Sequence, residues 1–303
     1  MDRLKSMAVF VKVVEYGSFS SAGEAMTMSS QLVGKHIQSL EQHLGTSLIN
    51  RTTRRQHLTD AGRVFYERVK VILSEVESAE SLVAIRQGVP RGLLRVNAPV
   101  SFGIHALSKS LPDYLMQNPD VSVDMSLSNR NVDIIEEGFD IAFRVGELPD
   151  SGLVARQLSP YRLILSAAPS YFNNRQKPRH PDDLRMYECL SFSFTEQRTK
   201  WTFMGPEGLI VVPVNGRLMI DTGEALLNAA RAGLGLLYQP EELVKDDLNN
   251  GQLIEVLPDY PIPVRPFHIL YAPDRRMTPK LRSFIDFVME RFGPDTKKSK
   301  PHK

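Results

Sequence analysis

The sequence predicts an α+β multidomain fold, in which a small helical module with a β wing precedes one long helix and a two-lobed α/β region. Three observations lead to this prediction. The length of 303 residues suits about two domains of roughly 150 residues each. Apolar residues recur at helical spacing up to residue 87, and strand-like runs alternate with helix-like runs beyond it. The hydrophobic fraction of 42% and the charged fraction of 24% are ordinary, which excludes disordered and fibrous classes.

Composition also restricts the compartment and the partner. With one cysteine, Cys189, the chain cannot form an internal disulfide, which argues against a secreted disulfide scaffold. No apolar run approaches about 18 residues and no signal-peptide pattern opens the chain, so we expect a cytoplasmic protein without a membrane partner. Residues 1–58 hold seven Lys and Arg against four acidic residues, and residues 293–303 hold four Lys against one Asp. These basic ends on a mildly acidic body favour a polyanionic partner.

The first 45 residues predict three short helices. Apolar residues on one face of 4–15 predict the first helix, and Gly17 ends it. The serines at 20–21 and at 29–30 are the candidate N-caps of the second and third helices, because a serine oxygen accepts hydrogen bonds from unpaired helical N–H groups. Gly45 ends the third helix, which turns an apolar stripe inward: Val33, Ile37, Leu40 and Leu44.

The outward face of the third helix is polar, and a polar arginine-rich stretch follows it. Two short apolar runs, 48–49 and 57–58, flank that stretch and predict a small β wing. A helix–turn–helix reads DNA through a helix with one buried face and one face of short polar donors, and wing arginines reach phosphates or a narrow minor groove. A solvated surface helix is the alternative. The candidate DNA contacts are Ser30, Gln31, Gly34, Lys35, Gln38, Arg51, Thr52, Thr53, Arg54 and Arg55.

A long helix is predicted for 59–87, which contains no proline and one glycine, Gly62. Its apolar residues recur at heptad spacing, and a heptad seam requires a partner helix. The same helix of a second subunit is the simplest partner, so 59–88 is predicted to form a dimer or tetramer. Packing on the following domain is the alternative. The seam consists of Phe65, Val69, Ile72, Val76, Ala79 and Val83.

Residues 89–303 predict an α/β region with mostly parallel sheets, arranged as two lobes with a cleft between them. Lobe I is expected at about 91–162 and 267–292, lobe II at about 163–266, and a disordered tail at 293–303. The strand-like runs are 93–98, 121–127, 139–145, 163–168, 234–238, 253–257 and 267–272. The helix-like runs are 103–117, 129–137, 223–232 and 279–292.

The run from residue 18 to residue 62 resembles the winged helix–turn–helix of the LysR-type transcriptional regulators, at many fixed offsets. The matching residues are Phe19, Ser20, Ala22, Ser29, Val33, Ile37, Leu40, Glu41, Leu44, Gly45, Leu48, Arg51, Thr52, Thr53, Arg54, Leu58, Thr59 and Gly62. The likeness continues along the chain at 94–96, 137–146, 155–158, 181–184 and 232–235. It implies a DNA-binding domain at 1–58, a dimerising linker helix at 59–88 and an effector-binding domain at 89–303. That last domain resembles type 2 periplasmic solute-binding proteins.

The resemblance also implies residue roles. It places base reading on Ser30, Gln31, Leu32, Gly34 and Lys35, and a minor-groove contact on Arg54. Gly34 stands where the family commonly has serine, and Gly23 where alanine is usual. In a helix each glycine costs about 1 kcal/mol relative to alanine.

A small-molecule effector, expected to be an organic anion, is implied between the lobes near strand ends and helix N-termini, which attract anions. The corresponding residues are Ser101, Phe102, Arg144, Gly146, Ser193, Thr195 and Thr222. Simpler roles compete: Ser101 and Thr222 as plain N-caps, and Phe102 as core.

The leading hypothesis is therefore a sequence-specific transcription regulator controlled by an effector. Its expected partners are double-stranded operator or promoter DNA, the effector, a second copy of the chain and RNA polymerase. A solute-binding protein without a DNA role and a Rossmann-like enzyme are the alternatives. Metal-ligand spacing, a dinucleotide fingerprint and a nucleophile elbow are all missing from the sequence, so we expect no cofactor, no metal and no catalytic residues.

Overall fold

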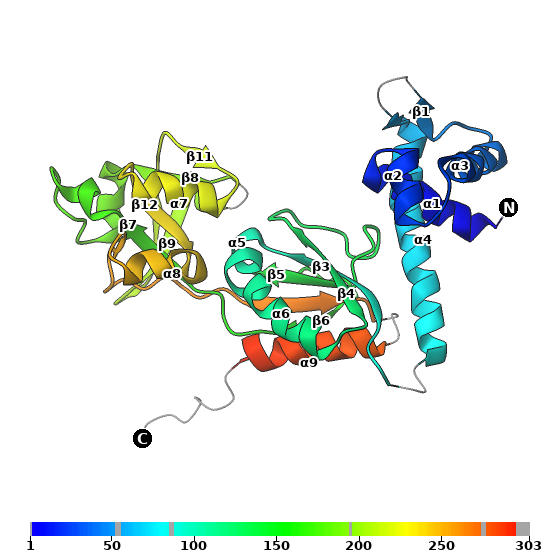
Figure 1. Ribbon diagram of the computed structural model, residues 1–303. Helices are drawn as coiled ribbons and strands as arrows, with labels where there is room; N and C mark the ends of the chain where they lie inside the picture. Colours follow the sequence, from blue (N-terminus) through cyan, green and yellow to red (C-terminus); the bar gives the residue numbers. More distant parts are fainter. Residues whose placement is uncertain (1, 52–55, 85–87, 194–195, 274–276, 295–303) are drawn as a thin grey trace. The chain divides into compact units, whose positions relative to one another are not determined.

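The computed structural model describes residues 2–51, 56–84, 88–193, 196–273 and 277–294. Its contacts divide the chain into two compact units. The first comprises Met1–Val89 with Asp133–Phe139, and the second comprises Pro90–Val132 with Asp140–Lys303. Figure 1 shows that helices dominate the first unit and that sheets form the centre of the second. Within the described ranges, no helix is both long and apolar enough to span a bilayer.

The first unit consists of a helical bundle, a wing and a long helix, as predicted. In chain order its elements are α1 (Arg3–Tyr16), α2 (Phe19–Ala25), α3 (Ser30–Leu44), β1 (Ile49–Arg51), β2 (Gln56–Leu58) and α4 (Asp60–Ala84). Gly17 and Gly45 end α1 and α3 in the left-handed region, at φ of 72° and 67°. A glycine adopts this conformation without the steric cost of a Cβ atom, which explains why both helices stop there.

Serine hydroxyls begin the second and third helices. Ser29 caps α3, because its Oγ accepts a hydrogen bond from the Leu32 N–H at 3.2 Å. The cap of α2 is Ser18, whose Oγ accepts from the Ser21 N–H at 3.0 Å. The predicted cap at Ser20 or Ser21 is therefore wrong, because the chain leaves its extended conformation one turn earlier, at Ser18.

The apolar faces of α1, α2 and α3 form the core of the first unit. Val33, Ile37 and Leu40 are buried, as the periodicity predicts. Leu44, the fourth residue of that stripe, is 39% exposed, so its prediction as a core residue is wrong. It is the last residue of α3, at the point where the chain turns away from the bundle.

The long helix α4 spans 25 residues and leaves the core partway along its length. Val69 is buried against the bundle, whereas Ile72, one step further along the predicted seam, is 40% exposed. Val76 is half-buried and Ala79 is exposed. The side chain of Val83 lies outside the described residues. The seam therefore continues along the helix surface after its contact with the bundle ends.

The second unit contains two five-stranded sheets. The order of the first is β4-β3-β5-β14-β6, with bounds β4 (Val121–Leu127), β3 (Gly92–Ala98), β5 (Ile141–Val145), β14 (Phe267–Tyr271) and β6 (Val154–Gln157). The order of the second is β11-β8-β12-β7-β13, with bounds β11 (Met219–Ile220), β8 (Cys189–Phe192), β12 (Leu236–Pro240), β7 (Leu163–Ala167) and β13 (Ile254–Glu255). A separate hairpin joins β9 (Lys200–Gly205) to β10 (Gly208–Pro213).

Both large sheets are mixed. Strand β3 pairs in parallel with β4 and β5, whereas β14 pairs antiparallel with β5 and β6. Strand β12 is parallel to β8 and antiparallel to β7. The prediction of mostly parallel sheets is therefore wrong. The chain passes from the first sheet to the second at 158–162 and returns at 256–266, so the returning strand β14 enters the first sheet in the opposite direction.

Helices cover these sheets. Their bounds are α5 (Val100–Phe102), a π-helical turn (Gly103–Leu107), α6 (Ser108–Gln117), α7 (Gly223–Arg231), α8 (Glu241–Asn249) and α9 (Pro279–Phe292). The helices predicted near 103–117, 223–232 and 279–292 are thus confirmed. Tyr114 of α6 and Phe284 of α9 pack edge to face, with ring centroids 5.0 Å apart. The same two helices lie together along one side of the first sheet in Figure 1.

The helix predicted at 129–137 is wrong, because that stretch forms turns. The Asp133 Oδ1 atom accepts hydrogen bonds from the N–H groups of Ile135 and Glu136, at 2.9 and 2.8 Å. Such local side-chain acceptors compete with the backbone hydrogen bonds of a helix. Several short elements also escaped the sequence analysis: β6, β8, β9, β10, β11 and α8.

Candidate DNA-binding surface and ligand pocket

One face of α3 is exposed and polar, opposite the buried stripe. The predicted contact residues on this face that are exposed are Ser30, Gln31, Leu32, Lys35 and Gln38. Ser30 and Gln31 lie in the first helical turn, where recognition helices contact base edges. Leu32 is 38% exposed and could contact a thymine methyl group. The helix therefore presents hydroxyl, amide, ammonium and apolar groups together on one surface.

Two glycines of this module differ in the space around them. A Cβ atom on Gly34, which is half-buried in α3, would lie 3.7 Å from the Phe19 ring, an ordinary contact. A Cβ atom on Gly23 would lie 2.6 Å from the Met28 carbonyl oxygen, which is closer than real Cβ atoms come. The Met28 N–H donates to the Gly23 carbonyl at 2.8 Å, so this turn depends on the close approach. At position 23 this close approach therefore outweighs the usual helical cost of a glycine.

A buried polar pair joins α3 to α1. Ser6 and His36 are 2% and 5% exposed, and the Ser6 Oγ and His36 Nδ1 atoms are 2.9 Å apart. The Ser6 hydroxyl donates its proton to the Asp2 carbonyl oxygen at 2.8 Å, so His36 Nδ1 carries the proton that it donates to Ser6. Burial lowers the pKa of His36 below 6.5, and the nearby Lys5 lowers it further. Neutral His36 therefore fixes the recognition helix on α1.

The wing is a two-stranded antiparallel ribbon in which Ile49 pairs with Leu58. Glu41 of α3 positions it, because its Oε1 atom accepts hydrogen bonds from the N–H groups of Leu48 and Ile49 at 2.8 and 3.1 Å. The backbone of Arg51 forms the end of β1. The predicted contacts Thr52, Arg54 and Arg55, and the side chain of Arg51, lie outside the described residues.

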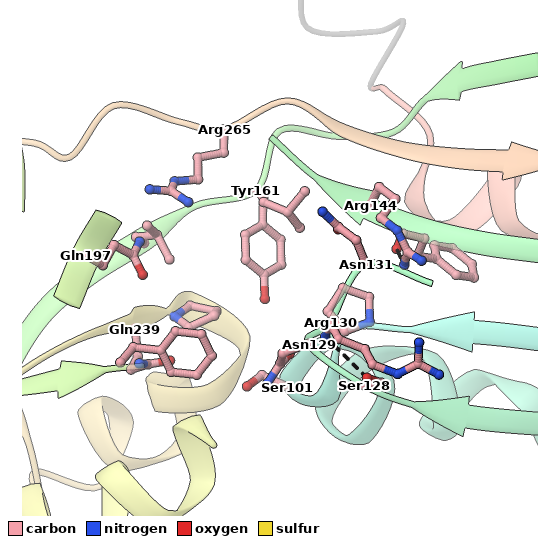
Figure 2. Close-up of a pocket in the computed structure, with 16 residues that line it drawn as sticks. Ser101, Ser128, Asn129, Arg130, Asn131, Arg144, Tyr161, Gln197, Gln239 and Arg265 are labelled. Atoms are coloured by element: carbon pink, nitrogen blue, oxygen red, sulfur yellow. Dashed lines mark hydrogen bonds between the residues drawn. The ribbon is translucent and has the colours of Figure 1, made fainter. Parts of the chain in front are cut away.

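The second unit contains a cavity of about 130 Å³. Figure 2 shows its lining residues, which come from α5 and the residue before it, the loop after β4, strands β5, β7, β8 and β12, the 3₁₀ turn Glu196–Arg198, and both connections between the sheets. The lining residues are Pro99, Ser101, Ser128, Asn129, Arg130, Asn131, Phe143, Arg144, Val145, Tyr161, Leu163, Phe192, Gln197, Gln239, Pro240 and Arg265. This set includes three arginines and no carboxylate, so the pocket suits an anion.

Two of the predicted effector residues, Ser101 and Arg144, line this cavity. The Arg144 Nη1 atom donates to Asn97 Oδ1 at 2.8 Å and to the Phe143 carbonyl oxygen at 2.7 Å, which fixes its position on β5. Ser101 lies inside α5, whose first residue follows Pro99, so its prediction as an N-cap is wrong. Its Oγ atom would be 3.1 Å from a Cβ atom placed on Gly223, the first residue of α7.

The other predicted residues that the structure describes do not line the cavity. Phe102 is 2% exposed and packs in the core, with its ring 4.8 Å from that of Phe267. The N–H group of Gly146 donates to the Pro266 carbonyl, and that of Ser193 donates to the Ile220 carbonyl. Thr195 lies outside the described residues.

Thr222 occupies the N-cap position of α7, yet its hydroxyl makes no capping hydrogen bond. The Oγ1 atom of Thr222 instead donates to Asp221 Oδ1 at 3.2 Å. Position alone therefore identified the start of α7 correctly, whereas the role of the hydroxyl differs from the one expected.

Sequence reasoning missed most of the pocket, because the missed residues come from strands, loops and connections that are distant along the chain. Asn129 is central: its Oδ1 atom accepts from the Val100 N–H, and its Nδ2 atom donates to the Asp221 carbonyl, both at 3.1 Å. Tyr161 and Arg265 belong to the two connections between the sheets and exchange backbone hydrogen bonds of 2.8 and 2.9 Å. No local periodicity or motif marks these positions.

The buried Tyr161 hydroxyl in the pocket is a neutral hydrogen-bond donor. Burial raises the pKa of Tyr161 far above 10, and the carboxylates of Glu242 and Glu224 raise it further, so its hydroxyl keeps its proton. Burial likewise raises the pKa of the Cys189 thiol to about 12, so this cysteine of β8 is a buried apolar group outside the pocket lining. Across the described ranges, no group of three or more His, Cys, Asp or Glu residues could hold a metal ion.

Comparisons with known proteins agree with this geometry. A family model described as a bacterial regulatory helix-turn-helix protein of the lysR family matches residues 4–63, and the LysR substrate binding domain matches 87–293. An HTH-type transcriptional regulator of Xanthomonas campestris is 36% identical, and the alignment covers 96% of this chain and 86% of that protein.

Two solved structures have the same arrangement of elements. CrgA, a LysR-type transcriptional regulator from Neisseria meningitidis, is 31% identical with a TM-score of 0.63, over 96% of this chain and 99% of that one. AphB, a virulence activator of Vibrio cholerae, is 28% identical with a TM-score of 0.62, over 96% of this chain and 99% of that one.

Proposed function

This chain belongs to the LysR family of transcription regulators, and we propose that it binds double-stranded DNA through α3 and the wing, under the control of a small organic anion. The observation that carries the proposal is the pairing of an exposed polar face on α3 with a pocket that contains three arginines and no carboxylate. The first surface suits base edges and phosphates, and the second suits a carboxylate.

On the DNA side, we assign base contacts to the first two turns of α3. Ser30, Gln31 and Lys35 supply hydrogen-bond donors to base edges, and Leu32 supplies an apolar contact. Gln38 lies one turn further along the same exposed face. Gly34, which is half-buried and faces the Phe19 ring, is left out of the assigned contacts. From the sequence, Arg51, Thr52, Arg54 and Arg55 of the wing are assigned to phosphates or the minor groove.

Assembly follows from α4. The exposed residue Ile72 continues the heptad seam beyond the point where α4 leaves the core. We propose that the α4 helix of a second copy covers this seam, which would place two α3 helices on neighbouring half-sites. An activator that contacts RNA polymerase would do so from this assembled form.

A salt series on the full chain tests the DNA side of the proposal. Binding to a promoter fragment that contains the operator should weaken steeply with salt, because each phosphate contact releases counterions. Replacing Lys35 by Ala should reduce the preference for operator over scrambled DNA by about tenfold, the loss expected for one base contact of about 1–3 kcal/mol. Lys12→Ala is the matched control, because the Lys12 ammonium already pairs with Glu15 on α1 at 2.7 Å.

Two outcomes of this series count against the assignment. An equal loss for operator and scrambled DNA in Lys35→Ala would reassign Lys35 to a phosphate. A flat dependence of binding on salt, together with no preference for any fragment, would refute the proposed DNA function.

A further inference from the structure

Building on the proposed anion pocket, we propose that its ligand is a small dicarboxylate, with one acidic group near Arg144 and the other near Arg265. The two arginines belong to different parts of the second unit. Arg144 lies on β5 of the first sheet, and Arg265 lies on the connection that returns from the second sheet. A ligand with an acidic group at each end would contact both.

The Arg265 side chain carries the main observation. It is half-buried at the wall of the cavity, and its guanidinium forms no hydrogen bond or ion pair with any other described residue. Its backbone, in contrast, is held by two hydrogen bonds to Tyr161, of 2.8 and 2.9 Å. A guanidinium that lines a cavity and has no acidic partner among the described residues can donate charge-assisted hydrogen bonds to a ligand carboxylate.

The second end of the pocket is built differently. Arg144 donates to Asn97 Oδ1 and to the carbonyl oxygens of Phe143 and Val132, and these contacts orient its guanidinium at the wall of the cavity. Figure 2 shows Arg144 and Asn131 on one side of Tyr161, and Arg265 and Gln197 on the other. The two acidic groups of the ligand therefore lie on opposite sides of Tyr161.

The space between these two ends limits the length of the ligand. The cavity of about 130 Å³ is slightly smaller than an engineered apolar cavity of about 150 Å³ that holds benzene, so it favours a short ligand. The wall of the pocket is partly apolar, with Phe143, Leu163 and Phe192 among its lining residues. The Tyr161 hydroxyl points into the cavity and adds a neutral donor between the ends. A straight-chain diacid of this length matches both features.

Paired acids of equal carbon number test the inference on the full chain. Isothermal titration calorimetry would compare succinate with butyrate, glutarate with pentanoate, and adipate with hexanoate. The best diacid should bind the parent chain about tenfold more tightly than its monoacid. In Arg265→Gln the diacid should lose about tenfold in affinity, while the monoacid changes by less than about twofold. Arg265→Lys keeps the charge and should retain part of the preference.

A control variant and a folding check make the result decisive. Arg282→Gln removes a positive charge from an exposed position on α9 that does not line the cavity, and it should leave both affinities unchanged. The melting temperature of each variant without ligand shows whether it folds. If Arg265→Gln does not fold, Arg265→Lys provides the test. A diacid preference in Arg265→Lys equal to that of the parent would overturn the inference. The absence of any diacid preference in the parent would also overturn it.

Failure of the inference is distinguishable from failure of the anion pocket. Equal binding of monoacids and diacids, or a diacid preference that survives in Arg265→Gln, would overturn the dicarboxylate assignment. Monoacid binding that is lost in Arg144→Gln would, in the same experiment, still support an anion pocket. If neither class of acid binds the folded parent chain, both the dicarboxylate assignment and the proposed anion effector are refuted.

Discussion

The recognition surface on α3 and the ligand pocket are assembled in opposite ways. The α3 surface comes from a single helix of 15 residues, in which one periodic pattern separates the buried face from the exposed face. The pocket combines residues from Pro99 to Arg265, supplied by strand ends, loops and the connections between two sheets. A local pattern therefore suffices to locate the first site, whereas the second exists only after the unit has folded.

This contrast predicts different sensitivities to substitution. Substitutions in the first unit should change its stability through helix packing and turn geometry. The exposed residues of α3 are held in place by the buried apolar face of the same helix. Changes near the pocket should act on ligand affinity, since the lining side chains are held by neighbours from other elements. The largest effect is expected in the core of the first unit.

The strongest test concerns the stripe of α3, because periodicity treats Leu40 and Leu44 alike and the structure does not. Leu40 is 1% exposed and Leu44 is 39% exposed. Leu40→Ala should lower the free energy of unfolding of the first unit by about 2–5 kcal/mol, because it leaves a cavity in the core. Leu44→Ala should cost about 0.5 kcal/mol or less. Urea denaturation monitored by circular dichroism measures both, and equal losses would contradict the assigned burial.

The second test compares two glycines of the helix–turn–helix. Gly23→Ala should destabilise the first unit by about 1–3 kcal/mol, because the new methyl group would overlap the Met28 carbonyl oxygen. Gly34→Ala should instead stabilise it by up to about 1 kcal/mol, because the added Cβ atom has room and favours the helix. Thermal denaturation of the two variants and the parent would show the opposite signs. A gain in stability for Gly23→Ala would refute the role assigned to the turn.

Features of the fold that depend on neighbouring residues could be predicted from the sequence, whereas features that depend on distant contacts could not. The bundle, the wing and α4 were predictable because caps, glycine stops and apolar periodicity act over a few residues. The short strands β8 and β11 were missed because their pairing partners lie far away in sequence. The antiparallel entry of β14 was missed because it depends on how the chain returns from the second sheet.

The residues that line the cavity show this limit most clearly. The family resemblance marks the positions of Ser101 and Arg144, and both line the cavity. Asn129, Tyr161 and Arg265 carry no local signal, since they reach the cavity through contacts across loops and connections. Sequence patterns therefore identified the region of the cavity but not most of its lining residues.

The third prediction compares Thr222, which the family resemblance assigns to the effector site, with its neighbour Gly223. Gly223→Ala would place a Cβ atom 2.7 Å from Gln239 Oε1 and 3.1 Å from Ser101 Oγ, two atoms of pocket-lining residues. This variant should weaken binding of the preferred acid by about tenfold, about 1.4 kcal/mol. Thr222→Ala should leave the affinity within about twofold, because the Thr222 hydroxyl bonds only to Asp221. Calorimetry measures both, and the reverse order of effects would restore Thr222 as the contact.

The last prediction concerns pH and is confined to the first unit. The pKa of His36 is lowered in the folded state, chiefly by burial, whereas the unfolded chain titrates near 6.5. Below about pH 6.5 the unfolded chain therefore binds a proton at His36 that the folded chain does not bind. Stability should fall as the pH decreases through this range, by at most about 1.4 kcal/mol per pH unit, and level off below the folded pKa.

His36→Asn isolates this proton, because an amide keeps a donor that can reach Ser6 but does not titrate. The melting temperature of the parent should fall more steeply between pH 8 and pH 5 than that of His36→Asn. His43→Asn, at an exposed position on the same helix, should follow the parent curve. Parallel curves of melting temperature against pH for the parent and His36→Asn would show that protonation of His36 does not change the stability of the first unit.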